Sequence, residues 1–300
     1  MSDARFVGLI DCMFADLPRQ CGVFLLAGDT NVLVDSGPSV TVDNVLRGME
    51  ARGVGPGDLD YILLTHFHLD HAGGASVLLQ RCPNARIVVD ERSAKYMADP
   101  SRLISSAAKS LGDIAPYYGT MLPVPPERIV PLTDGYELDI GAGRSIRAIH
   151  TPGHSGGHYS FLAMPERYVF CGDSLGHYIE EQDYVYPATP APEFNPDKSI
   201  ASARRLLELE PEVFLFPHYG SSRHPESVVE QFERQVRRSV ELAESIDPAE
   251  RTAGRLGALL FDDIPGVTDA EAPVLKGILE VNAAGVLHYL AARDQHGGSG

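Results

Sequence analysis

The chain has 300 residues, 44% of them hydrophobic, a length that suits one large domain or a domain with an appendage. Its 25 Lys and Arg residues are outnumbered by 41 Asp and Glu residues, which gives a formal net charge of −16. Such a surface repels nucleic-acid backbone and anionic lipid, so we expect neither a nucleic-acid nor a membrane partner. The charge itself does not identify the small-molecule substrate that the motifs described below lead us to expect. No apolar run approaches the roughly 20 residues of a membrane span, and Met1 to Arg5 lack a signal-peptide pattern.

The four cysteines are scattered and form no Cys-x-x-Cys motif: Cys12, Cys21, Cys82 and Cys171. This usage predicts a cytoplasmic protein with free and mostly buried thiols. Cys171 stands two residues before Asp173, and strand alternation would place both side chains on one face. We nevertheless expect Cys171 to be a buried thiol rather than a metal ligand.

The first part of the chain alternates short apolar runs with turn residues, as strands do. Strands are predicted at 7–10, 22–27, 31–35, 58–64 and 86–90. Apolar residues at helical spacing predict one helix at 40–52 and another at 75–80. Residues 91–126 differ, because they hold Ala- and Ser-rich helical pieces, the pair Tyr117-Tyr118 and a proline cluster. This segment is either a lid or substrate-facing insertion, or a packed surface excursion.

The strands return in the second part of the chain. They are predicted at 129–130, 135–140 and 145–150, with a hairpin formed by 159–163 and 168–171. We interpret 176–192 as an irregular run, rich in aromatic residues and prolines, that could also form a lid. Asn195 and Pro196 begin a predicted helix that ends near Glu210. A buried strand at 213–216 and a long helix at 225–244 follow.

The character of the chain changes after Asp247-Pro248, where short helical pieces replace the strands. Thr268 and Glu271 have the spacing of a capping box. The last helical run, 274–292, would cover the catalytic domain, close a substrate pocket or form a homodimer contact. We therefore predict a catalytic domain at 1–246, and a C-terminal helical appendage with a flexible tail at 247–300.

The densest cluster of potential metal ligands lies directly after the apolar run 61–64. His66, His68, Asp70 and His71 fall within a few residues of one another. Borderline ions such as Zn²⁺ bind this mixture of nitrogen and oxygen donors. The pair Gly73-Gly74 follows and lets backbone approach closely. The segment therefore predicts a strand that ends in a metal-binding loop, in preference to a solvated His-rich loop.

Three further candidate ligands each follow an apolar strand and stand near Gly or Pro: His154, Asp173 and His218. Two metal ions need about seven or eight protein donors. The four donors of the His-rich loop and these three reach that number. Because ligands on strand-end loops of one scaffold can converge on one point, the sequence predicts a binuclear centre.

The order of these motifs resembles the metallo-β-lactamase-fold hydrolases. The motifs are Asp35, Thr-His-Phe-His-Leu-Asp-His at 65–71, Thr-Pro-Gly-His at 151–154, Cys-Gly-Asp at 171–173 and Phe-Pro-His at 216–218. The resemblance implies an α+β protein, an αββα sandwich of two mixed β-sheets flanked by helices, with a metal centre at one edge. It also implies that Asp35 braces the His-rich loop by hydrogen bonds.

The same resemblance implies a division of the ligands between two ions. His66, His68 and His154 would hold the first ion, Asp70, His71 and His218 the second, and Asp173 both. Zn²⁺ is the first expectation for both ions, with Fe or Mn as alternatives. Such ions activate a bridging water and stabilise the developing anion. Asp70 would orient the water or pass a proton to the leaving group.

These features predict a hydrolase acting on a small ester, lactone, thioester or phosphoester. The alternative is a mononuclear iron enzyme of the persulfide-dioxygenase kind, which uses the same fold. A metal-dependent binding or regulatory protein that kept the site is a third interpretation. The acidic composition disfavours a nuclease.

Other polar residues near the motifs have weaker signals. His177 and Tyr178 are candidates for substrate contact, and Tyr219 either reaches the site or packs beneath the metal loop. His158 is not expected to reach the site, because the preceding glycines argue against a helix that would align it with His154. The remaining histidines are expected to be strand, surface or core residues: His150, His224 and His288.

Overall fold

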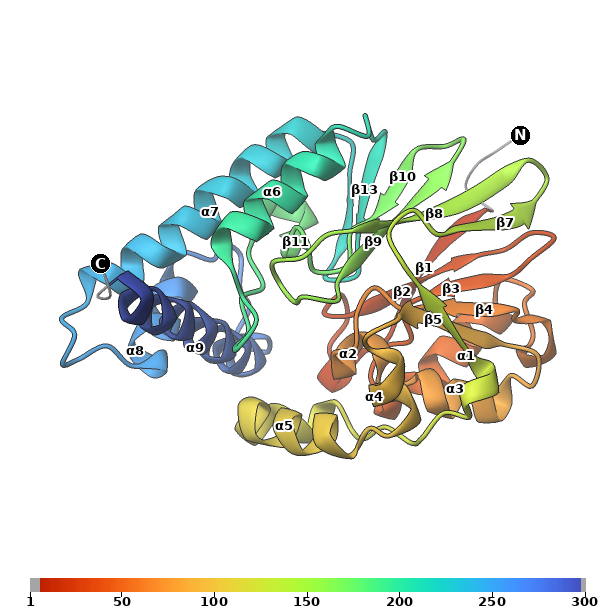
Figure 1. Ribbon diagram of the computed structural model, residues 1–300, viewed down its shortest axis with the longest axis horizontal. Helices are drawn as coiled ribbons and strands as arrows, with labels where there is room; N and C mark the ends of the chain where they lie inside the picture. Colours follow the sequence, from red (N-terminus) through yellow and green to blue (C-terminus); the bar gives the residue numbers. More distant parts are fainter. Residues whose placement is uncertain (1–5, 298–300) are drawn as a thin grey trace.

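The computed structural model describes residues 6–297 and shows two β-sheets packed face to face between layers of helices (Figure 1). The first sheet has the order β1-β2-β3-β4-β5-β6. Its strands are β1 (Val7–Asp11), β2 (Gly22–Leu26), β3 (Val32–Val34), β4 (Tyr61–Leu63), β5 (Arg86–Asp90) and β6 (Ile129–Leu132). Strands β1 to β3 pair antiparallel, and β3 to β6 run parallel, so this sheet is mixed.

The second sheet has the order β14-β13-β10-β9-β8-β7. Its strands are β7 (Glu137–Gly141), β8 (Arg144–His150), β9 (Tyr159–Met164), β10 (Tyr168–Phe170), β13 (Val213–Phe216) and β14 (Gly220–Ser222). Only β10 and β13 pair in parallel; the other neighbours are antiparallel. The predicted αββα sandwich of two mixed sheets is therefore confirmed.

Strand alternation explains how the layers are held together. On β2, Phe24 and Leu26 point into the core between the sheets, whereas Val23 and Leu25 point into the outer core beneath the helices. Helices α1 (Val42–Glu50) and α3 (Ala75–Arg81) cover the first sheet. Helices α6 (Pro196–Leu207) and α7 (Pro225–Ser245) cover the second sheet (Figure 1). The Asn195 carboxamide accepts a hydrogen bond from the Lys198 amide at 2.9 Å, which confirms the predicted helix start.

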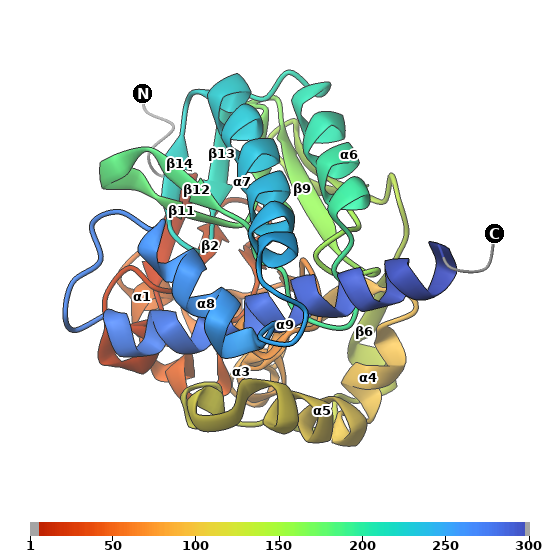
Figure 2. The same ribbon diagram turned by 90° about the vertical axis from the view of Figure 1, so that its left-hand side faces the viewer.

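The segments outside the sandwich are mostly helical. Helices α4 (Ala94–Ala98) and α5 (Ser101–Leu111) lie within the 91–126 segment, and α8 (Ala253–Asp262) and α9 (Ala272–Gly297) follow α7. Figure 2 shows α9 running across the molecule between α7 and α5. The predicted capping box is present, because Thr268 Oγ1 donates to Glu271 Oε2 at 2.6 Å and accepts from the Glu271 amide at 3.4 Å.

Three predicted elements differ from the structure. The strand expected at 58–64 begins only at Tyr61, because the Asp58 carboxylate accepts from the Gly55 amide and closes a turn. The run 176–192 is not irregular throughout: β11 (His177–Ile179) and β12 (Tyr184–Tyr186) form an antiparallel hairpin. Helix α9 continues to Gly297, beyond the predicted end, and the final residues of the expected flexible tail lie outside the described residues.

The proposed division at 246–247 stays a prediction. Helix α9 packs against α7 and α5 as well as α8, so the C-terminal helices contact the sandwich and the 91–126 segment. Among residues 6–297, no helix is both long and apolar enough to cross a bilayer.

Candidate metal centre

The His-rich loop follows β4 and includes a short helix, α2 (Leu69–Ala72). His66 and His68 precede this helix, whereas Asp70 and His71 lie within it. The backbone amide and the hydroxyl of Ser36 both donate to the His71 carbonyl at 2.7 Å, which fixes α2 against the end of β3. A Cβ atom on Gly74 would lie 2.7 Å from the Ser36 carbonyl, so the close backbone approach predicted for the glycine pair occurs here.

Three imidazole nitrogens converge in a first group, which we call the three-histidine cluster: His66, His68 and His154. His66 Nε2 lies 3.0 Å from His68 Nδ1, and His154 Nε2 lies 2.8 Å from the same His68 atom. Burial, together with the neighbouring His154, lowers the pKa of His68 to about 3. Burial also lowers the pKa of His66 and of His154. The three rings are therefore neutral near pH 7 and present lone pairs to one point.

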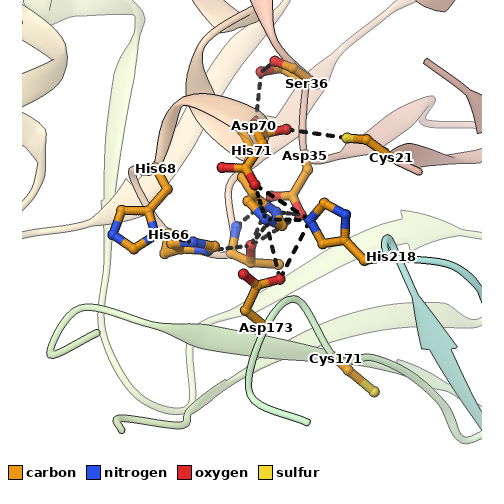
Figure 3. A network of polar contacts seen from close by, with 12 residues as sticks. Cys21, Asp35, Ser36, His66, His68, Asp70, His71, Cys171, Asp173 and His218 are labelled. Carbon is orange, nitrogen blue, oxygen red and sulfur yellow. Dashed lines mark hydrogen bonds and ion pairs between the residues drawn. The ribbon is translucent and has the colours of Figure 1, made fainter. Parts of the chain in front are cut away.

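A second group, the carboxylate cluster, lies beside the first and contains Asp70, His71, Asp173 and His218. His71 Nε2 lies 3.2 Å from Asp173 Oδ1 and 3.2 Å from His218 Nε2. His218 Nε2 also lies 3.5 Å from Asp70 Oδ2. Figure 3 shows these side chains pointing toward one another from separate segments.

Asp173 faces both clusters. Its Oδ1 atom is directed at His71, and its Oδ2 atom lies 3.5 Å from His154 Nε2. The structure thus brings all seven predicted ligands together at the point where the strands end. The position of Asp173 between the two clusters is the one that the resemblance implies for a shared ligand.

The outer nitrogens of three histidines are held by oxygen atoms. His154 Nδ1 donates to the Ala188 carbonyl at 3.0 Å, and His218 Nδ1 donates to the Gln20 carbonyl at 2.7 Å. His71 Nδ1 lies 2.9 Å from Asp35 Oδ2. A carbonyl oxygen can only accept, so the proton of each neutral ring is on Nδ1, and Nε2 has a free lone pair. Outer partners of this kind orient metal-binding histidines.

Asp35 has the bracing position that the sequence predicts for it. Its Oδ1 atom accepts from the Thr65 amide at 2.8 Å, and both of its oxygens lie 3.0 Å from the Thr65 hydroxyl. The contact with His71 completes its shell, and the side chain is buried. Asp35 therefore joins the His-rich loop to the end of β3 without entering either cluster.

His158 positions Asp173, a role that the sequence did not reveal. The Asp173 amide donates to His158 Nε2 at 2.9 Å, so the proton of this buried ring is on Nδ1, which donates to the Thr151 hydroxyl at 2.8 Å. The prediction that His158 does not reach the site is therefore wrong: His158 belongs to neither cluster, but its ring lies against that of His66 with a centroid separation of 5.0 Å. The sequence offered one signal for this position: an apolar strand begins directly after His158, and a residue next to such a strand is expected to be buried.

The donor set fits bound cations. Asp173 Oδ1 is buried and accepts no hydrogen bond of normal geometry, although its ion-pair partner His71 Nε2 lies 3.2 Å away, and a buried oxygen in this state costs free energy. Burial lowers the pKa of His71, but Asp173, Asp70 and Asp35 outweigh it and raise the pKa well above its usual value. In the metal-free protein a proton on His71 thus offsets part of the negative charge of these carboxylates. A metal cation bound at the same place would offset that charge instead. Two groups of nitrogen and oxygen donors suit Zn²⁺ and similar ions.

A cavity of about 380 Å³ opens over this centre. His68, Asp70, His154, Asp173 and His218 lie at its floor. Its walls come from the 91–126 segment, from the loop after β12 and from α9, through residues such as Tyr118, Leu103, Ala188 and Ile278. The structure therefore places the 91–126 segment toward the site. Of the three roles predicted for the last helical run, the position of α9 fits that of closing a pocket.

The weaker candidates divide between the cavity and the core. His177 lines the cavity and stacks on His218 with a centroid separation of 4.3 Å. Tyr178 does not line it, because its hydroxyl donates to Asp183 at 2.9 Å within the hairpin. Tyr219 also lies outside this cavity, with its ring beneath Arg19. Cys171 is buried, its thiol pointing away from the clusters (Figure 3), and all four cysteines are free, as expected.

Two further residues near the metal centre escaped the sequence analysis, and only the second of them lines the cavity. The Tyr186 hydroxyl pairs with His177 Nδ1 at 2.9 Å, and the β11–β12 hairpin that joins them was not predicted. Tyr118 lines the cavity, and burial together with nearby Asp70 raises the pKa of its hydroxyl well above its usual value. The only sequence signal for Tyr118 was its place in the Tyr117-Tyr118 pair.

A family model described as the metallo-beta-lactamase superfamily matches residues 16–218, which include every predicted ligand. The chain belongs to this superfamily. Its sequence is 32% identical to the metallo-beta-lactamase fold-containing protein ST1585 of Sulfurisphaera tokodaii over 210 residues, or 68% of this chain and 75% of that relative. It is 28% identical to the hydroxyacylglutathione hydrolase of Aeromonas hydrophila over 186 residues, but these cover only 55% of that enzyme.

Solved structures of this superfamily share the fold over nearly the whole chain. The crystal structure of ST1585 superimposes with a TM-score of 0.74 and 27% identity, covering 94% of this chain and 98% of that protein. The family protein TTHA1429 of Thermus thermophilus superimposes with a TM-score of 0.72 and 20% identity, covering 98% of this chain and 95% of that chain. These coverages include the C-terminal helices as well as the sandwich.

Proposed function

We propose that this superfamily member is a binuclear metal-dependent hydrolase that acts on a small ester, lactone or thioester, or on a phosphoester. The placement of Asp173 supports this most directly, because one carboxylate oxygen faces the three-histidine cluster and the other faces the carboxylate cluster. A single ion would leave one of these two groups of donors without a partner. Zn²⁺ is the proposed ion, and Fe and Mn are the alternatives.

Divalent ions held by these residues would supply an activated water and stabilise negative charge on the attacked oxygen. The chain provides the remaining functions. The Asp70 side chain is 20% exposed toward the cavity, and His71 and His218 hold its pKa low despite its burial. Asp70 can therefore accept a hydrogen bond from the attacking water and pass a proton to the leaving group.

Tyr118 is suited to contact the substrate. Its raised pKa keeps the hydroxyl protonated, so this group can donate a hydrogen bond to a substrate oxygen in the cavity. His177, held by Tyr186, stacks on His218 of the carboxylate cluster. Hydrolysis by a metal-activated water requires no nucleophilic side chain. This agrees with the burial of all four cysteines.

The competing proposal is a mononuclear iron enzyme of the persulfide-dioxygenase kind. The carboxylate cluster argues against it, because four donor atoms of this group lie within 4.8 Å of one another in addition to the three-histidine cluster. The four free cysteines support the further proposal of a cytoplasmic location.

Metal analysis paired with a substrate panel tests the proposed function. The protein is purified without added metal and assayed with lactone, thioester, phosphodiester and persulfide substrates, with and without oxygen. We expect two ions per chain and hydrolysis that does not depend on oxygen. One iron per chain with oxygen consumption on the persulfide would refute the proposal.

A further inference from the structure

The cavity above the metal centre is bounded by two helices that are far apart in the sequence. Helix α5 contributes Leu103, Ala107 and Leu111, and α9 contributes Ile278 and Val281. Phe67, between two proposed ligands, lies nearer the floor and stacks on Tyr96 at a centroid separation of 5.5 Å. The path from the metal centre to the α5–α9 wall is therefore bordered by apolar side chains.

Helix α5 has an apolar face that the protein buries only in part. Leu103, Ala107 and Leu111 are spaced four residues apart and so form one stripe. None of the residues of α5 is fully buried, and these three line the cavity. A surface helix normally covers such a stripe with its own core. Here the stripe packs only partly against the core and also lines the hollow, so an apolar occupant would gain free energy by covering the remaining apolar surface.

Charged groups in the cavity are restricted to the floor and the rim. Apart from the proposed ligands, its charged lining residues are Arg102 and Glu193, and both are exposed. The Glu193 carboxylate already accepts a hydrogen bond from the Gly156 amide at 2.6 Å. An anionic group placed between floor and rim would therefore lose hydration without an ionic partner beside it, because the cationic Arg102 belongs to the exposed rim.

We infer that this cavity binds the apolar acyl chain of an uncharged carboxylic ester, lactone or thioester, whose carbonyl lies at the metal centre. The inference rests on the proposed function and selects the carboxylic substrates from it, at the expense of phosphoesters. Water adds to the carbonyl carbon, the bond from that carbon to oxygen or sulfur breaks, and the leaving group takes a proton. The products are a carboxylic acid with its apolar chain and an alcohol or thiol, which remain joined as one hydroxy acid when the substrate is a lactone.

Acyl-chain length provides the first test. The metal-loaded protein is assayed with p-nitrophenyl esters from acetate to octanoate. Each methylene that enters the cavity should raise kcat/KM by up to roughly fourfold, the equivalent of about 0.8 kcal/mol. A kcat/KM that is independent of chain length would overturn the inference.

A pair of adjacent substitutions locates the effect on α5. Ala107 lines the cavity, whereas Ala108 is exposed and does not line it. We expect Ala107→Phe to lower the octanoate-to-acetate ratio of kcat/KM at least about tenfold, which corresponds to the exclusion of two or more methylenes. Ala108→Phe should leave this ratio unchanged. Equal ratios in the two variants would contradict the assignment.

A binding measurement separates this inference from the proposed function. The chain has no tryptophan, so Tyr96→Trp adds a single fluorescent reporter to the cavity wall, and exposed Tyr117→Trp, outside the cavity lining, serves as its control. The probe is 2-nonanone, an uncharged ketone with no bond to hydrolyse. We expect a saturable emission change in the Tyr96→Trp protein, abolished by adding Ala107→Phe, and no change in the control.

The outcomes for the two hypotheses differ. A response to 2-nonanone in a protein that hydrolyses no ester would refute the proposed function and keep the acyl cavity. Ester hydrolysis without a response to 2-nonanone would keep the function and overturn the acyl cavity.

Discussion

The three-histidine cluster and the carboxylate cluster share Asp173 but differ in charge. The first consists of imidazoles whose pKa values are lowered by burial, that of His68 to about 3. In the second, carboxylates outweigh the same burial and raise the pKa of His71 and of His218. The comparison shows that histidines a few residues apart in one loop can differ in the direction of their pKa shift, and therefore in whether a cation must displace a proton.

Asp35 accounts for part of this difference. It contacts His71 directly and adds a third carboxylate to the surroundings of that ring, whereas it does not touch His68 or His154. Near pH 7 the three-histidine cluster can accept an ion without losing protons. The carboxylate cluster must first release a proton from its histidines. We therefore expect the two ions to bind in steps that respond differently to mutation and to pH.

The largest expected effect comes from removing the shared carboxylate. Asp173→Asn keeps the shape of the side chain but removes the charge that faces both clusters. We expect hydrolysis to fall about a thousandfold or more, roughly 4 kcal/mol in the activation free energy. Metal analysis should find fewer than two ions per chain.

Asp90→Asn is the matched control, because Asp90 is equally buried, but its carboxylate contacts Arg92 and Ser93 rather than a proposed ligand. Two ions and ordinary activity in Asp173→Asn would show that the clusters do not share this residue. A loss in both variants would point to damage to the fold rather than to the centre.

The pH dependence of metal binding should separate the clusters. Acidification favours the proton on His71 in the metal-free protein, because the surrounding carboxylates raise its pKa. From about pH 8 to about pH 6 the affinity of the carboxylate cluster should therefore fall by up to about tenfold per pH unit for each proton displaced. The three-histidine cluster should change little, because the pKa of His68 is about 3. Calorimetry in buffers of different ionisation enthalpy counts the protons, and equal counts for both steps would argue against this difference.

A smaller effect, mainly on the affinity for the second ion, is expected from a substitution of Asp35. In Asp35→Asn, one oxygen replaces the two that now accept from Thr65 and His71. Changes to groups that orient metal ligands typically lower affinity by about 10–100-fold. We expect this loss for the second ion and a much smaller loss for the first, measured by competition with a chelator. Equal losses at both clusters would contradict the bracing role of Asp35.

The sequence was most informative where the chain carries dense polar motifs on apolar strands. The convergence of the seven proposed ligands could be predicted from the residues, because each follows a strand or stands near a glycine-rich turn. The bracing position of Asp35 and the order of layers were implied by the family resemblance. The role of His158 could not be predicted, since its partner is the backbone amide of Asp173, contributed by a different loop. The β11–β12 hairpin was missed because its strands are only three residues long and lie among prolines and aromatic residues.

The cavity was the least predictable part of the site. Its walls join α5 and α9, which are separated by more than half of the chain, and their apolar stripes are also compatible with ordinary core packing. Only the three-dimensional arrangement shows that the stripe of α5 faces a hollow. For the same reason the sequence left open whether 91–126 faces the substrate.

The smallest expected effect comes from a residue that belongs to neither cluster. Thr268→Ala removes the side-chain cap at the start of α9, which should lower the free energy of unfolding by about 1 kcal/mol. Chemical denaturation measures this change, while metal content and the proton counts of the two binding steps should stay as in the parent protein. A change in either metal step would show that α9 influences the centre more strongly than its contacts indicate.

The most direct test of the account is a titration of the metal-free protein with Zn²⁺, followed by native mass spectrometry and calorimetry. The account predicts saturation at two ions per chain in two distinguishable steps, with proton release concentrated in one of them. Saturation at a single ion, with the carboxylate cluster left unused, would contradict it.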